Sequence, residues 1–140
     1  MKKPTNKDLV NLYYEELWNK KNKDYIDILF DDNIIFYGSL GVECEGKKEF
    51  ESYMDTIHAG IPDLFHSITQ WVVDDNSIAV RAIYAGRHSG NLLDFEATNS
   101  RLMYNGATFF KFYDGKIQSV WVLGDLHGLL EQLRNNSSNK

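Results

Sequence analysis

Near its C-terminal end the sequence reads Asp114-Gly115-Lys116-Ile117-Gln118-Ser119-Val120-Trp121-Val122-Leu123-Gly124-Asp125, and we expect the rest of the fold to be built around this stretch. Asp-Gly is among the strongest short signals for a β-hairpin. The mostly apolar residues after it predict a buried strand, which ends on a single carboxylate, Asp125. A carboxylate at the end of a buried strand is costly unless it is paired or used. We therefore expect an apolar pocket whose reactive end is Asp125.

The strand before this turn is predicted to be long. Residues 96–113 could form one bent strand, with Gly106 as a bulge or kink. A simple two-residue hairpin places Tyr113 opposite Lys116 and, by counting along both strands, Tyr104 opposite Asp125. A bulge at Gly106 would shift the last pairs by one residue.

Two further strands precede it. Residues 65–74 and 77–88 alternate with the period of two that is typical of strands, and Asp75-Asn76 is a turn between them. On the second of these strands His88 shares a face with the core residues, so we expect it to point inward at the far end of the strand.

The first half of the chain has helical patterns instead. Thr5 and Asp8 resemble a capping box, and apolar residues recur at helical spacing after them. Further helices are predicted at Asp24 to Phe30 and at Lys47 to Ala59, where Gly60 and Pro62 end the last one. Between them we expect a short strand, Ile34 to Tyr37, and a loop from Gly38 to Gly46.

The length and composition limit the function classes. The 140 residues fit one domain, which we expect to span 1–140 with a core at about 9–133 and with tails at 1–4 and 135–140. The net charge of -5, with no basic run longer than two residues, argues against nucleic acid as a partner. The single cysteine, Cys44, cannot form an intramolecular disulfide. With no signal peptide or membrane span in the pattern, we expect a cytoplasmic protein with no membrane partner.

Three helices, the long antiparallel strands after them and a short C-terminal helix predict an α+β fold, with the N-terminal helices packed on a curved antiparallel or mixed sheet. A curved sheet with helices across its mouth would enclose a conical cavity. The chain resembles the SnoaL-like polyketide cyclases, a family of the nuclear-transport-factor-like superfamily of cone-shaped α+β barrels, from about Leu9 to Leu133. The resemblance rests on these stretches: Tyr13 to Lys20; Pro62-Asp63; Gly86-Arg87-His88-Ser89-Gly90, similar to a Gly-Thr-His-x-Gly turn; and Phe110 to Ile117 with Trp121, Asp125 and Gly128 to Leu133.

The resemblance implies a chemistry. In the cyclases the aspartate matching Asp125 is the general acid/base of an intramolecular aldol ring closure, without a metal or an organic cofactor. Such chemistry needs a desolvated carboxylate and a hydrogen-bond donor for the enolate oxygen. Tyr104 and His88 are the candidate donors. The segment Leu92 to Thr98 departs from the family's Gly-x-Pro-Pro-Thr-Gly pattern, and the strand Ile34 to Tyr37 lacks the acid of the related ketosteroid isomerases.

Aromatic and apolar residues supply the candidate pocket lining, and each of them could instead belong to the core. The candidates are Tyr14, Trp18, Tyr37, Tyr53, Met54, Tyr84, Phe110, Trp121 and Leu123. His58 and His66 are expected to be structural or exposed, and the histidine spacing predicts no metal site.

Two functional classes follow from this pattern. The first is a cofactor-independent enzyme of the polyketide or ester cyclase type, which acts on a small apolar carbonyl compound. The second is a module that binds a small hydrophobic molecule, or dimerises, without turnover. Asp125 discriminates between them: burial near Tyr104 or His88 favours the enzyme, whereas a role as helix cap alone favours the module. In both cases we expect a homodimer through the outer sheet face, with Ala107, Phe109, Val120 and Val122 on it.

Overall fold

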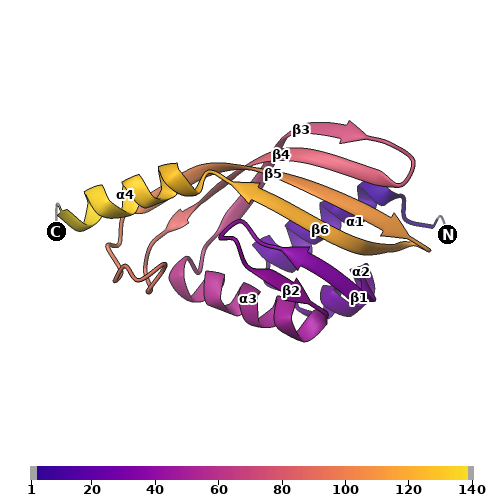
Figure 1. Ribbon diagram of the computed structural model, residues 1–140, viewed down its shortest axis with the longest axis horizontal. Coiled ribbons are helices and arrows are strands. Elements are labelled where there is room, and N and C mark those ends of the chain that lie inside the picture. Colours follow the sequence, from indigo (N-terminus) through magenta and orange to yellow (C-terminus); the bar gives the residue numbers. More distant parts are fainter. Residues whose placement is uncertain (1–2, 139–140) are drawn as a thin grey trace.

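A computed structural model describes residues 3–138 of the chain (Figure 1). Six strands form one mixed sheet in the order β2-β1-β6-β5-β4-β3, with the N-terminal helices packed on one side and a C-terminal helix at one end. The predicted cone-shaped α+β fold is confirmed. Within residues 3–138, no helix combines the length and the apolar character needed to cross a bilayer.

The helices begin and end close to the predicted positions. They are α1 (Asn6–Leu12), the π-helix η1 (Tyr13–Asn19), α2 (Asp24–Leu29), α3 (Lys47–Gly60) and α4 (Leu126–Ser138). The capping box at the start of α1 is present, because the Thr5 hydroxyl accepts from the Asp8 N–H and the Asp8 carboxylate accepts from the Thr5 N–H. No local pattern marks the π-helix, in which the Lys20 N–H donates to the Glu15 carbonyl.

The strands are β1 (Phe30–Tyr37), β2 (Glu43–Glu45), β3 (Phe65–Val73), β4 (Ser77–Arg87), β5 (Arg101–Tyr113) and β6 (Lys116–Gly124). Neighbouring strands are antiparallel except β1 and β6, which run parallel. Three boundary predictions are wrong: β1 begins at Phe30, the loop after it contains β2, and residues 96–100 precede β5 as loop. Residues 135–138 of the expected tail belong to α4, and 139–140 lie outside the described residues.

The β5–β6 hairpin corrects the predicted register. Its turn is as expected, with Asp114 and Gly115 both at positive φ and Tyr113 paired with Lys116. Ile117 then pairs with Phe112, but Ser119 pairs with Lys111, so Gln118 is an extra residue without a partner in the ladder. This bulge reverses the faces of β6 beyond it. Val120 and Val122 are therefore buried, whereas Trp121 and Leu123 lie on the outer face.

Gly106 is not the site of the irregularity. It pairs regularly with Ala82 on β4 and with Gly124 on β6. The reason for a glycine there is space, because a Cβ atom would lie 2.4 Å from the hydroxyl oxygen of Tyr84. Gly106 thus makes room for an inward-pointing tyrosine.

Candidate functional site

An interior cavity lies between η1, α3 and the inner face of the sheet. Its volume is about 30 Å³, which is room for about two water molecules. The side chains around it are Tyr13, Tyr14, Trp18, Phe36, Ser39, Tyr53, Ile57, Leu64, His66, Tyr84, Tyr104, Thr108 and Val122. No carboxylate is among them, so the polar side-chain groups of the cavity are hydroxyls, one imidazole and the indole N–H of Trp18.

Three of the hydroxyls form the Thr108 cluster, which consists of Tyr14, Tyr84 and Thr108. The Tyr14 hydroxyl donates to Oγ1 of Thr108 at 2.9 Å, and the Tyr84 hydroxyl lies 3.4 Å from the same atom. The three side chains come from η1, β4 and β5. Burial raises the pKa of Tyr14 and Tyr84, so both hydroxyls keep their protons.

A second group, the Ser39 cluster, consists of Ser39, Tyr53 and Tyr104. The Ser39 side chain interacts with both tyrosine hydroxyls and acts to lower the pKa of each. Burial outweighs this effect and raises the pKa of both tyrosines. The rings of Tyr104 and Tyr84 pack edge to face with centroids 5.1 Å apart, which brings the two clusters together across the cavity.

His66 is the only imidazole around the cavity, and Asn19 fixes its tautomer. The Asn19 Nδ2 donates to the His66 carbonyl, and the Asn19 Oδ1 accepts from the His66 N–H at 2.8 Å. Oδ1 also lies 3.1 Å from Nδ1 of the ring, so Nδ1 carries a proton and donates. Burial and the neighbouring His58 lower the pKa of His66 to about 3. The ring is therefore neutral near pH 7, and Nε2 is left as an acceptor.

The sequence matches the SnoaL-like polyketide cyclase family over residues 8–133. The chain belongs to this family. No curated protein matches the chain.

Several solved structures share the fold. A protein from Jannaschia sp. CCS1, provisionally assigned as a SnoaL-like polyketide cyclase, is similar at a TM-score of 0.85 and 17% identity, over 91% of this chain and 90% of its own. A SnoaL-like polyketide cyclase from Agrobacterium tumefaciens is similar at a TM-score of 0.76 and 24% identity, over 95% and 99%. TsrD from Streptomyces laurentii is similar at a TM-score of 0.81 and 19% identity, over 95% and 97%. At these identities the similarity shows the fold alone.

Asp125, the aspartate matched to the general acid/base of the SnoaL-like cyclases, is exposed and does not line the cavity. Its Oδ1 accepts from the Gly128 N–H at 2.9 Å, and its carbonyl accepts from the Leu129 N–H. This is the geometry of an N-cap for α4. The predicted pairing with Tyr104 is wrong, because the bulge at Gln118 shifts the ladder.

The two candidate donors separate in the structure. Tyr104 lines the cavity within the Ser39 cluster. His88 is fully buried but outside the cavity lining, where its Nδ1 accepts from the Thr98 N–H. Backbone hydrogen bonds from His88 to Ser100 and from Asn99 to His88 hold the same loop. In the structure, His88 therefore holds the loop 88–100 in place through hydrogen bonds.

The predicted pocket residues divide into three groups. Tyr14, Trp18, Tyr53 and Tyr84 line the cavity. Met54 and Phe110 are fully buried in the core away from it. Tyr37, Trp121 and Leu123 are on the outer face, where the rings of Tyr37 and Trp121 stack with centroids 6.0 Å apart. For Trp121 and Leu123 the pocket prediction is wrong, since the Gln118 bulge turns them outward.

Sequence reasoning missed several lining residues. His66 was expected to be structural or exposed, yet its ring packs against Trp18 and Tyr84 inside the cavity. Ile68, two residues later on β3, packs against the core. Because side chains two residues apart on a strand share a face, Ile68 could have indicated that His66 also points inward. Ser39 lies in a loop and carried no signal. Across residues 3–138, no three His, Cys, Asp or Glu side chains are placed to hold a metal ion together.

Proposed function

We propose that the interior cavity binds the carbonyl group of a small, largely apolar molecule. The supporting observation is a surplus of hydrogen-bond donors. In the Thr108 cluster three hydroxyl protons share two hydrogen bonds, which leaves one proton to give, and the three hydroxyls of the Ser39 cluster have at least one more. His66 Nε2 can accept only one of these two protons. The remaining donor, between aromatic walls, matches a carbonyl oxygen.

The test compares acetophenone with ethylbenzene, which has the same shape without the oxygen. Both are titrated into methyl-labelled protein, with Val122 and Leu64 as interior reporters. Because one neutral hydrogen bond contributes about 1 kcal/mol, acetophenone should bind about fivefold more tightly than ethylbenzene. An unchanged spectrum, or equal affinities of the two compounds, would overturn the proposal.

Two hydroxyl-free variants identify the donor. One combines Tyr14→Phe, Thr108→Val and Tyr84→Phe, and the other combines Ser39→Ala, Tyr53→Phe and Tyr104→Phe. Removing the hydroxyls of a cluster together leaves none of them without its partner, and the one other loss is the acceptor of the Leu40 N–H in Tyr53→Phe, so both variants should fold. One of them should lose the preference for acetophenone, while the other keeps it. Retention of the preference in both variants would show that neither cluster binds the carbonyl.

Turnover is the second candidate, with Asp125 as the acid/base. Two observations favour turnover. The first is that the chain belongs to a polyketide cyclase family. The second is that Asp125 directly follows Gly124, and Gly124 packs so closely on Ser39 that a Cβ atom added to Gly124 would lie 2.9 Å from the Cβ of Ser39. An enzyme of this kind should accelerate exchange of the acetophenone α-protons in D₂O, and Asp125→Asn should abolish the acceleration. Binding without exchange would favour the module. The exposed cap geometry of Asp125 leads us to expect the module.

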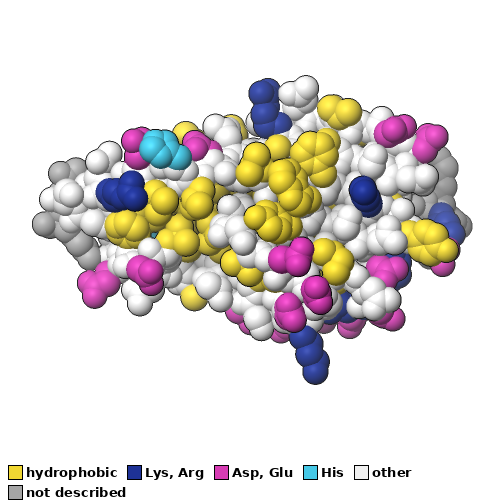
Figure 2. All heavy atoms as spheres, viewed as in Figure 1, with side chains coloured by type: hydrophobic (Ala, Val, Ile, Leu, Met, Phe, Trp, Pro, Cys, Tyr) yellow, Lys and Arg dark blue, Asp and Glu magenta, His cyan; other side chains and the backbone are white. Residues whose placement is uncertain are grey.

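We also propose that two copies of the chain pair through the outer sheet face. Hydrophobic side chains gather over β6 and its neighbours on the face shown in Figure 2. Phe109 is 51% exposed, Trp121 43% and Leu123 59%. Phe109 and Trp121 border a groove with Ile35 and Tyr37. A contiguous apolar surface of this kind on a strand face is typical of an interface.

A further inference from the structure

A second and much larger hollow adjoins the interior cavity. This α3 cleft lies between α3, the segment from Leu40 to Cys44, and the turn at Leu92-Leu93, and its volume is about 560 Å³. Pockets for small molecules have volumes of about 300–1,000 Å³. The interior cavity, at about 30 Å³, is far too small to hold a whole ligand. The cleft has the room that the cavity lacks.

Tyr53 separates the two spaces. Tyr53 and Ile57, one turn apart on α3, line both the cavity and the cleft. The Tyr53 hydroxyl accepts from the Leu40 N–H at 3.4 Å and interacts with the Ser39 side chain. Its ring lies against Gly38, where a Cβ atom would come within 2.4 Å of Cζ. The Tyr53 ring thus forms part of the partition between the two spaces, beside Ile57.

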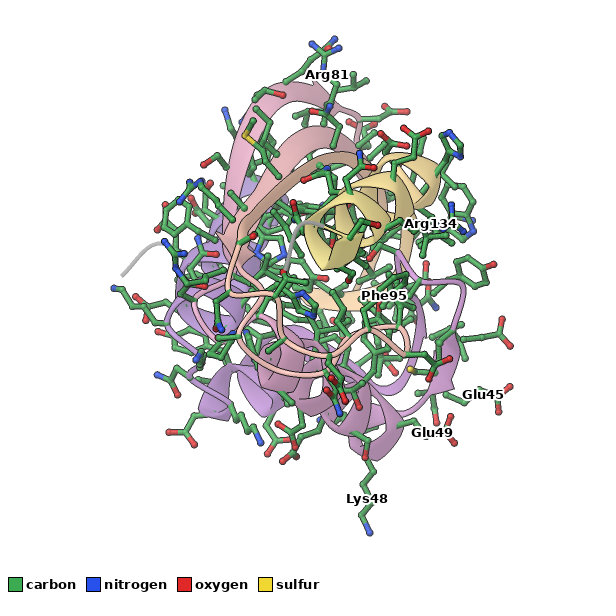
Figure 3. The ribbon with its side chains drawn as sticks, turned by 90° about the vertical axis from the view of Figure 1, so that its left-hand side faces the viewer. Glu45, Lys48, Glu49, Arg81, Phe95 and Arg134 are labelled. Carbon is green, nitrogen blue, oxygen red and sulfur yellow. The ribbon has the colours of Figure 1, made fainter. Side chains whose placement is uncertain are left out.

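The far wall of the cleft is a hydrogen-bonded turn that contributes Leu92 and Leu93 to the lining. Leu92 and Phe95 exchange both backbone hydrogen bonds, at 3.0 and 2.8 Å. This closes a turn in which Leu93 and Asp94 have φ of 49° and 66°. Positive φ is uncommon for leucine, and strained residues of this kind concentrate at ligand sites. Figure 3 views this end of the molecule, with Phe95 between α4 and α3.

The charges at the rim select against an anion. Glu43 and Glu49 line the cleft together with Lys48. Figure 3 shows Lys48 extending away from the body of the molecule into solvent, with Glu45 and Glu49 on the same side. Two carboxylates against one outward-pointing ammonium group disfavour a negatively charged ligand.

From these observations we infer that the α3 cleft binds the neutral apolar body of the ligand whose carbonyl enters the interior cavity, with Tyr53 as the gate between the two. The ligand is thus a neutral carbonyl compound with a body larger than one aromatic ring. The inference rests on the proposed function, since it assigns the remainder of the same ligand.

The probe is 2-acetylnaphthalene, which adds a second ring to acetophenone. It should bind about tenfold more tightly than acetophenone, and it should shift interior methyl signals (Val122, Leu64) and cleft methyl signals (Val42, Leu92) with the same Kd. 2-Naphthoate, which has the same rings with a carboxylate, should bind at least tenfold more weakly than 2-acetylnaphthalene.

Leu93→Asp tests the wall of the cleft without straining the turn, because aspartate tolerates positive φ better than leucine does. It should weaken 2-acetylnaphthalene binding about tenfold and acetophenone binding by a smaller factor, because the single ring reaches less of the cleft. Val72→Asp, at a 59% exposed position on β3 away from the cleft, is the matched control and should change neither affinity. Gly38→Ala, which displaces the Tyr53 ring, should speed the association of both probes.

The outcomes separate the two proposals. If both probes shift only the interior signals, with equal affinity, the cleft inference is wrong and the proposed function stands. If 2-acetylnaphthalene shifts only the cleft signals, the gate and the shared ligand are overturned. If neither probe shifts the interior signals, both proposals fail. Equal binding of 2-acetylnaphthalene by Leu93→Asp and wild type would also overturn the cleft inference.

Discussion

The burial of His66 should make the free energy of unfolding depend on pH. Burial and His58 lower its pKa to about 3, whereas an unfolded histidine titrates near 6.5. Between these values the unfolded chain binds the proton and the folded chain does not, so the free energy of unfolding decreases as the pH falls through this window. Each pH unit is equivalent to about 1.4 kcal/mol, so His66 should lower the free energy of unfolding by about 2 kcal/mol between pH 6.5 and pH 5.

Urea unfolding at pH 7, 6 and 5 measures this effect. His66→Gln should lose less stability than wild type on acidification, because the neutral amide cannot take up the proton. His127→Gln changes a histidine on the exposed surface of α4 and should keep the wild-type slope. If His66→Gln and wild type have the same slope, His66 is not held neutral by the fold.

Asp125 has a measurable role as a helix cap. Asp125→Ala removes the acceptor of the Gly128 N–H and should lower the free energy of unfolding by about 1 kcal/mol. Asp125→Asn keeps an oxygen acceptor and should retain most of the stability. Chemical denaturation of the two variants distinguishes the roles: an equal loss in both would show that the charge matters rather than the cap, and would reopen the acid/base assignment.

At the scale of the elements, the turn between β5 and β6 depends on its glycine. Gly115 has a φ of 74°, and a Cβ atom there would meet nothing within 4 Å. Gly115→Ala should therefore destabilise through backbone conformation alone, by about 1 kcal/mol. Asp114→Asn should be neutral, because asparagine suits the positive φ at that position equally well. A neutral Gly115→Ala variant in thermal unfolding would contradict the turn geometry.

The same hairpin shows where prediction from sequence ends. The Asp-Gly signal and the alternating pattern correctly predict both strands and the pairing of Tyr113 with Lys116. The bulge at Gln118 has no local marker, since glutamine between Ile117 and Ser119 fits an unbroken strand equally well. A single extra residue reverses every later side chain on β6. For this reason the orientations of Trp121, Leu123 and Asp125 could not be predicted.

The interior site was predictable only where its residues lie on regular elements. Tyr14, Trp18 and Tyr53 follow helical spacing, and Tyr84 follows the phase of β4, so their inward orientation could be predicted. Ser39 is in a loop, and the part played by His66 depends on Asn19, which is 47 residues away in sequence. Tertiary contacts of this length have no signature in one sequence.

At the scale of the whole molecule, the exposed outer face predicts an assembly. Trp121→Glu would place a charge in the middle of the apolar face, beside Phe109 and Tyr37. We expect wild type to sediment as a dimer and Trp121→Glu as a folded monomer, with unchanged acetophenone affinity because the cavity is on the opposite side of the sheet. Glu51→Gln, an exposed position on α3, is the control and should remain dimeric. A monomeric wild type would contradict the proposed interface.

The central claim is that hydroxyls of the interior cavity bind the carbonyl oxygen of a ligand. The carbonyl ¹³C chemical shift of labelled acetophenone bound to the protein tests it most directly, because hydrogen bonds to the oxygen move that signal downfield. We predict a bound signal at or downfield of its position in water, and an upfield shift in one of the two hydroxyl-free variants. A wild-type signal upfield of water, as in a hydrocarbon solvent, would show that the oxygen has no hydrogen-bond donor, and would contradict the claim.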